Sequence, residues 1–260
     1  MDNTSQRMSA FRPAPLKSFD PNAFVENADY SQDLCDVILG LAFLYNDLKD
    51  TLAVIEALMN TQPGDVKDFY LSPEWGEYMG RDMHMFRHHV GLLHEVLEFI
   101  HENNAVFQTA QFQSIIKILP FDRRLEWEDI HGAATSKKVT GDFGKQLVIM
   151  RNNAAFHYNA KEIGKGFREY FIRPNAEPAF MSLGKSILTS RFYFADAAGQ
   201  NYVKRVLGSK DYSTFTCEIK DLFVKASHAF SAIIDRFIVK RGFPYRVVPS
   251  ANTATGPGPE

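Results

Sequence analysis

Three long stretches of the chain carry apolar residues at steps of three and four, and this spacing restricts the fold more than any other feature. The stretches run from Leu34 to Met59, from Trp75 to Ile100 and from Phe215 to Phe237. This is the period of an amphipathic α-helix. Each such helix has one apolar face, which has to be buried against another element. The chain is therefore predicted to be built on helices that pack against one another.

Local signals mark where these helices begin and end. Ser31 is placed to cap the first helix, and the Ser72-Pro73 pair marks the start of the second. Gly242 follows the last helix as a C-cap. A further helix is expected to begin at Asp142 and to run through Leu147 and Met150, with shorter helical segments before it. The fold class predicted is all-α, an antiparallel bundle of four to five helices.

Residues of about 160–212 interrupt this pattern with several glycines and prolines. They predict a small irregular insertion before the last helix, with a β-hairpin formed by 179–183 and 187–194 and a short helix over 196–207. The chain is therefore predicted to have three parts. Residues 1–30 are expected to form an extended N-terminal segment, residues 31–245 to form one helical domain that carries the insertion, and residues 246–260 to form a disordered tail.

Composition excludes several classes of protein. The chain has 260 residues, 29 basic and 31 acidic, with a net charge of −2. It is not a basic protein that coats nucleic acid, so any RNA contact has to come from a local patch. No apolar stretch reaches the ~20 residues that a membrane span needs, and no secretory signal is present. We therefore expect a cytoplasmic protein that does not enter the membrane.

Cysteine and histidine usage argues against a metal site. Cys35 and Cys217 both lie in apolar helical patterns, which predicts buried, reduced thiols. Five of the eight histidines fall on the second helix: His84, His88, His89, His94 and His101. His84 and His88 share a face as some metal-binding pairs do, but no third ligand is apparent. A solvated polar face of the helix is the preferred interpretation, and no metal or cofactor is predicted.

One segment has residues that helix stability alone does not explain. It reads Ile-Met-Arg151-Asn152-Asn153-Ala-Ala-Phe-His157-Tyr158. On an ideal helix Arg151 and His157 flank the same edge, about 9 Å apart along the axis, while Asn152 falls on the far side. Two consecutive asparagines are poor helix formers in a helix interior. Either these polar groups are used by a site, or the helix is distorted there.

This segment resembles the motif of the HEPN superfamily, an Arg, a polar residue and then a His placed late in a helical bundle. The matching residues are Arg151, Asn152 and His157, and the order of long helices around them is similar as well. The resemblance covers about residues 31–160 and 214–241, and the motif is short. The insertion at 160–212 is not part of the family pattern.

The resemblance implies metal-independent cleavage of RNA by a symmetric homodimer, in stress response, toxin–antitoxin systems or phage defence. It gives His157 the role of general acid or base, Arg151 that of a phosphate clamp and Asn152 that of an orienting residue. Asn153 and Tyr158 are the candidate substrate-binding residues. These roles are chemically sound, because an imidazole titrates near neutral pH and a guanidinium binds phosphate through two hydrogen bonds. An antitoxin or another protein is the second kind of partner implied.

Two questions stay open at this point. A non-enzymatic dimerisation or interaction module of the same fold fits the sequence too, and it predicts an exposed apolar face on the motif helix. The insertion carries Arg168, Arg173, Lys185 and Arg191, which suit a basic wall that holds RNA, a lid or a surface elaboration. The aromatic run 190–196 suits base stacking, although a half-buried strand is the preferred interpretation.

Overall fold

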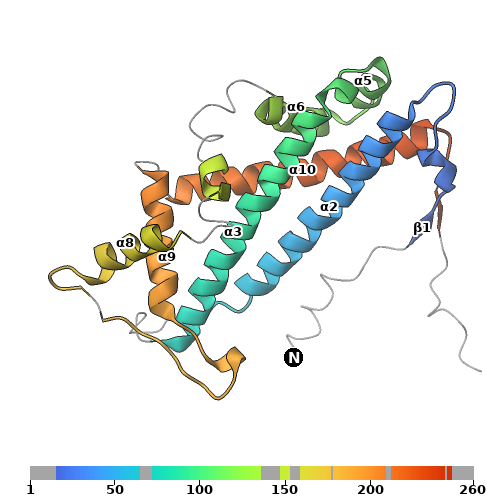
Figure 1. The fold of residues 1–260 in the computed structure, drawn as a ribbon. Helices are drawn as coiled ribbons and strands as arrows, with labels where there is room; N and C mark the ends of the chain where they lie inside the picture. Colours follow the sequence, from blue (N-terminus) through green and yellow to red (C-terminus); the bar gives the residue numbers. More distant parts are fainter. Residues whose placement is uncertain are drawn as a thin grey trace, which may run out of the picture.

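The structure is a computed structural model, and it describes residues 16–64, 72–135, 147–152, 159–176, 178–208, 212–243 and 245–247. The chain is mostly helical, which confirms the all-α prediction (Figure 1). The α-helices are α2 (Gln32–Met59), α3 (Pro73–Glu102), α4 (Asn104–Phe107), α5 (Ala110–Ile116), α6 (Phe121–Thr135), α8 (Ala160–Phe171), α9 (Tyr193–Leu207) and α10 (Tyr212–Lys240). The short elements are β1 (Lys17–Ser18), β2 (Arg246–Val247) and the 3₁₀ turns η1 (Pro21–Phe24) and η5 (Ile187–Thr189).

The predicted signals do begin and end the long helices. The Ser31 hydroxyl accepts the backbone N–H of Leu34 at 3.3 Å, and the Ser72 hydroxyl accepts that of Trp75 at 3.4 Å. Each bond satisfies one of the backbone donors that a helix leaves unpaired at its start. After α10 the chain leaves the helix at Gly242, whose φ is +80°, a value that glycine adopts without strain.

The core lies between α2, α3, α6 and α10. The helices α2 and α3 lie side by side, and α10 runs across both of them (Figure 1). The face of α10 toward the core is largely phenylalanine, with the rings of Phe215, Phe223, Phe230 and Phe237 fully buried. On α6, the centre of the Trp127 ring lies 5.0 Å from the ring centre of Phe107 and 5.3 Å from that of Phe112. These aromatic side chains supply much of the area that the fold buries.

The N-terminal segment packs onto the end of α10. Ala23 is completely buried, and the guanidinium of Arg241 donates to the carbonyl oxygens of Ala23 and Val25, both at 2.6 Å. Two residues predicted to belong to the disordered tail, Arg246 and Val247, pair antiparallel with β1. The sequence did not predict this pairing because a two-residue strand leaves no periodic pattern. The described part of the segment 1–30 is thus held at two places, where β1 pairs with β2 and where Arg241 binds the carbonyl oxygens of Ala23 and Val25.

The insertion differs from its prediction, since residues 160–171 form the helix α8 rather than irregular chain. Asn159 caps α8 by accepting the backbone N–H of Glu162 at 3.3 Å. Gly166, which suggested a break, instead lets α8 approach the backbone of α9. Of the predicted hairpin only one bridge forms, between Ser182 and Arg191. The preferred strand over 190–196 is also wrong, because the chain is helical from Tyr193 onward.

Candidate functional site

Two of the predicted site residues lie in the described part of the chain, and three do not. Arg151 and Asn152 are described, whereas Asn153, His157 and Tyr158 lie outside the described residues. The short helix over 147–152 buries Leu147 and Met150, as the predicted apolar stripe requires. Burial of these two side chains turns Arg151 toward the surface, where 37% of its side chain is exposed.

The helix is distorted where the motif begins. Arg151 and Asn152 adopt the wider π-helical turn rather than continuing the α-helix. Such turns are rare in proteins and often occur at functional sites. On an ideal helix Asn152 would lie on the far side, but here its Oδ1 accepts a hydrogen bond from Arg151 Nη1 at 3.0 Å. Asn152 therefore restrains the guanidinium, an arrangement that the ideal-helix geometry did not predict.

The helix α3 supplies a carboxylate and an imidazole beside this pair. Arg151 Nη2 lies 3.3 Å from Glu95 Oε1, and the same oxygen is 3.8 Å from His94 Nδ1. The His94 side chain is only 14% exposed, and its Nδ1 is buried without a hydrogen-bond partner among the described residues. A guanidinium, a carboxylate and an imidazole thus meet at the contact between α3 and the motif helix.

Sequence reasoning missed His94 and Glu95 as members of this site. Both belong to the histidine-rich helix, which was interpreted as a solvated polar face. That interpretation holds for His84, His88 and His101, which are exposed, but it is wrong for His89, which is buried. The adjacency of His94 and Glu95 to Arg151 depends on tertiary packing of residues 56 positions apart. No local pattern in the sequence could have revealed it.

Apolar side chains accompany the polar ones on the motif helix. Val148 is 41% exposed and Ile149 is 43% exposed, directly before the buried Met150. Both side chains are therefore open to solvent in part, on the helix that carries Arg151. An exposed apolar face on this helix is what the interaction-module alternative predicts.

Two of the basic residues of the insertion are engaged by neighbouring side chains. Arg191 donates from Nε to Asp196 Oδ2 at 2.8 Å and from Nη1 to Glu77 Oε2 at 3.3 Å. Its charge is therefore neutralised by two carboxylates. Arg173 lies over the ring of Tyr170, 5.6 Å from the ring centre. The idea that Arg191 holds RNA is consequently not supported by its surroundings.

Two other histidines, His131 and His228, have structural partners. His131 is 2.9 Å from Asn104 Oδ1 and packs against Trp127, and burial lowers its pKa. His228 Nδ1 is 2.9 Å from Glu126 Oε1. His84 and His88 line a shallow groove between α2 and α3 together with Asp47 and Asp50. Within the described residues, no three His, Cys, Asp or Glu side chains are arranged to hold a metal ion.

Comparison with known proteins gives no match to a family model, to a curated protein or to a solved structure. Among the described helices, none combines the length and the apolar character required to cross a bilayer.

Proposed function

We propose that this chain is a HEPN-like protein that cleaves RNA without a metal ion, at a site built around Arg151. One observation carries the proposal. The Arg151 guanidinium is held near the surface by Asn152 and Glu95, in a π-helical turn that coincides with the start of the motif. In the proposed fold, α2, α3, the motif helix and α10 form the antiparallel bundle.

The proposed reaction is an internal transfer of the phosphoryl group. A base takes the proton of the ribose 2′-hydroxyl, O2′ attacks phosphorus, the bond from phosphorus to O5′ breaks, and an acid gives O5′ a proton. His157 is assigned this acid–base role by the resemblance. Arg151 binds the nonbridging phosphate oxygens and stabilises the charge that grows on them in the transition state. Asn152 orients Arg151, and the products are a 2′,3′-cyclic phosphate and a free 5′-hydroxyl.

Glu95 gives Arg151 a partner when no RNA is bound. The ion pair between them is exposed enough for water and salt to weaken it, so a phosphate can replace the carboxylate. The guanidinium is thereby kept in one orientation before substrate arrives, which lowers the cost of ordering it on binding.

The test is cleavage of a 5′-labelled RNA of mixed sequence in the presence of a chelator. We expect the wild type to leave cyclic phosphate ends, and Arg151→Ala and His157→Ala each to lose about 100-fold or more of the rate. Arg81→Ala is the matched control, because Arg81 also forms an exposed ion pair with a carboxylate of α3, Glu77. Cleavage that requires a metal ion, or that both site variants retain, would overturn the proposal.

The second candidate is a non-enzymatic interaction module, and the exposed Val148 and Ile149 favour it. In this alternative the motif helix joins two copies of the chain without any cleavage. Ile149→Asp is then expected to convert a dimer into a monomer in light scattering after gel filtration. Val54→Asp on α2 is the control, since Val54 is 51% exposed and lies on another helix. A dimer that cleaves no RNA under any salt condition would favour this module over the enzyme.

A further inference from the structure

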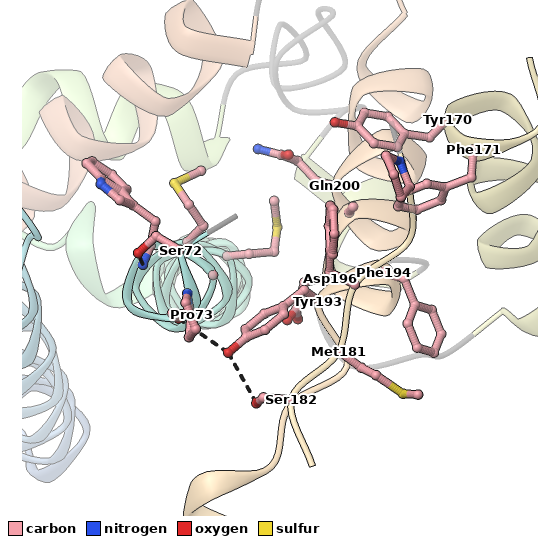
Figure 2. A pocket seen from close by; sticks show the side chains of 17 residues that line it. Ser72, Pro73, Tyr170, Phe171, Met181, Ser182, Tyr193, Phe194, Asp196 and Gln200 are labelled. Atoms are coloured by element: carbon pink, nitrogen blue, oxygen red, sulfur yellow. Dashed lines mark hydrogen bonds between the residues drawn. The ribbon is translucent and has the colours of Figure 1, made fainter. Parts of the chain in front are cut away.

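A second candidate site is a cavity of about 260 Å³. It is enclosed by the start of α3, by residues 178–182 and by the helices α8 and α9 (Figure 2). The described motif residues, Arg151 and Asn152, do not line it. The proposal for this cavity uses neither of them.

Two glycines of α3 let the insertion lie close to the helix, and one of them, Gly76, lines the cavity. A Cβ at Gly76 would collide with the ring of Tyr193, and a Cβ at Gly80 would collide with the guanidinium of Arg191. Both glycines lie on the same face of α3, one helical turn apart. Because the two glycines lack side chains, Arg191 and Tyr193 can lie directly against the helix. The insertion is thus fitted to α3 at these two positions.

Polar contacts hold this wall in place before any ligand binds. The Tyr193 hydroxyl lies 3.3 Å from the Pro73 carbonyl oxygen and 3.2 Å from Ser182 Oγ (Figure 2). Arg191 is fixed by its ion pairs with Asp196 and Glu77. These contacts join α3, the bridge at Ser182 and the first turn of α9. A preformed pocket avoids part of the ordering cost that weakens binding.

The cavity is lined mainly by aromatic residues and methionines, with few polar groups. Its apolar members include Trp75, Met79, Met83, Tyr170, Phe171 and Phe194. Aromatic faces and edges bind other rings well, and methionine adapts to the shape of a bound molecule. The polar members include Asp196, whose charge is already paired with Arg191, and Gln200. Gln200 lies between α3 and the rings of Tyr170 and Phe171 (Figure 2), and no described residue forms a hydrogen bond with its amide.

We propose that this pocket binds an uncharged aromatic small molecule of two or three rings that carries a hydrogen-bonding group. The rings fill the space between the methionines of α3 and the aromatic side chains of α8 and α9. The Gln200 amide, which can donate and accept, pairs with the polar group of the ligand. An anionic ligand is disfavoured, because the charged side chain that lines the cavity is the carboxylate of Asp196. Burying an unpaired negative charge there would be unfavourable.

The test uses two probes with the same rings. N-phenyl-1-naphthylamine is uncharged and has one N–H donor, and 8-anilino-1-naphthalenesulfonate is its sulfonated, anionic analogue. We expect the full-length chain to bind the uncharged probe saturably at one site, with a rise in probe fluorescence and quenching of Trp75. A Trp127→Phe background makes Trp75 the remaining tryptophan, since the chain has two. The anionic probe is expected to bind at least tenfold more weakly.

A matched pair of variants on α9 locates the binding. Ala197 lines the cavity, whereas Ala195 is exposed on the same helix. Ala197→Phe is expected to weaken binding of the uncharged probe at least tenfold, and Ala195→Phe is expected to leave it unchanged. If Ala197→Phe fails to fold, Gln200→Leu serves in its place, with an expected three- to tenfold loss. Equal binding by wild type and both pocket variants, no saturable binding, or equal binding of the two probes would overturn the proposal.

Discussion

Gly166 of α8 lies against the backbone carbonyl of Ala198 in α9, with no room for a Cβ between them. The backbone N–H of Tyr202 is also close, 3.2 Å from where that Cβ would lie. The two helices therefore touch through their main chains at this crossing. Asn201 adds a hydrogen bond from its amide nitrogen to the Gly166 carbonyl oxygen at 3.2 Å.

The substitution Gly166→Ala should therefore destabilise the protein, although alanine normally favours a helix. The added methyl group has to push two backbones apart, and overpacking of this kind costs about 1–3 kcal/mol. Gly164→Ala is the control on the same helix, because a Cβ there meets only the end of Arg168 at 3.5 Å. We expect this variant to gain about 0.5–1 kcal/mol. Urea denaturation measures both, and a stable Gly166→Ala variant would contradict the close crossing.

Buried His89 should make stability fall in mild acid. Its side chain packs edge-on against Phe223, and burial, helped by the nearby charges of His88 and Lys220, lowers its pKa to about 4. Between about pH 6.5 and pH 4 the unfolded chain takes up a proton that the folded chain does not. The free energy of unfolding should therefore drop across this range, by up to about 3 kcal/mol. Stability contributed by the neutral imidazole is complete above pH 6.5.

Replacing this histidine tests the source of the effect. His89→Leu should reduce the dependence of the unfolding free energy on pH, because it removes a histidine whose pKa burial lowers to about 4 in the folded state. His101→Leu, on the exposed face of the same helix, should leave the slope in place. Denaturant titrations between pH 4 and pH 8 provide the measurement. An unchanged slope in His89→Leu would assign the acid sensitivity to other groups.

Arg241 should control access to a cysteine. Its Nη1 lies 3.1 Å from the sulfur of Cys35, which is fully buried. Cys217 is exposed, so the prediction that both thiols are buried is wrong for that residue. In a Cys217→Ser background, Arg241→Leu should release the N-terminal segment and speed the reaction of Cys35 with a thiol reagent at least tenfold. The loss of two hydrogen bonds from a charged donor should also cost about 2–4 kcal/mol.

A suitable control for this variant is Arg236→Leu. Arg236 lies on the same helix and contacts only its neighbour Asp235 at 4.0 Å among the ion pairs of the described residues. The reactivity of Cys35 should stay at the wild-type rate in this variant. Equal acceleration by both variants would mean that Cys35 becomes reactive through general loosening of α10 rather than through Arg241.

In the proposed RNA site, Glu95 should compete with phosphate for Arg151. Glu95→Gln removes a carboxylate that lies 3.3 Å from Arg151 Nη2, so phosphate no longer has to displace it. We expect a short single-stranded RNA to bind about three- to tenfold more tightly, corresponding to about 1 kcal/mol. Fluorescence anisotropy at several salt concentrations measures this. Glu98→Gln, exposed on the next turn of α3, is the control. Unchanged RNA binding by Glu95→Gln would indicate that Arg151 does not contact the RNA.

The long helices were predictable because their information is local. Ser31, Ser72 and Gly242 lie where the caps are, and the spacing of buried residues follows the helical period. The helix α8 was not predictable on the same basis, because Gly166 suggests a break when it is read without its partner. It is present for the approach of α9, a contact that exists only in the tertiary structure.

The residues of the candidate site also differ in whether a local sequence signal marks them. Arg151 and Asn152 were proposed from the sequence because two asparagines in a helix interior contradict local preference. His94 and Glu95 were missed, since each is an ordinary residue of a polar helix face until the motif helix packs beside it. The cavity lined by Gly76 was missed for the same reason, as its walls come from four separate parts of the chain.

The clasp formed by Arg241 and the 3₁₀ turn η1 sets an order of events in folding. The residues it joins are 216 and 218 positions apart. Closing so long a loop has a large entropic cost, which is met only after other contacts have drawn the chain together. During synthesis η1 is made first, yet it has no partner until α10 has been completed. It should consequently be among the last parts of the molecule to acquire protection from hydrogen exchange.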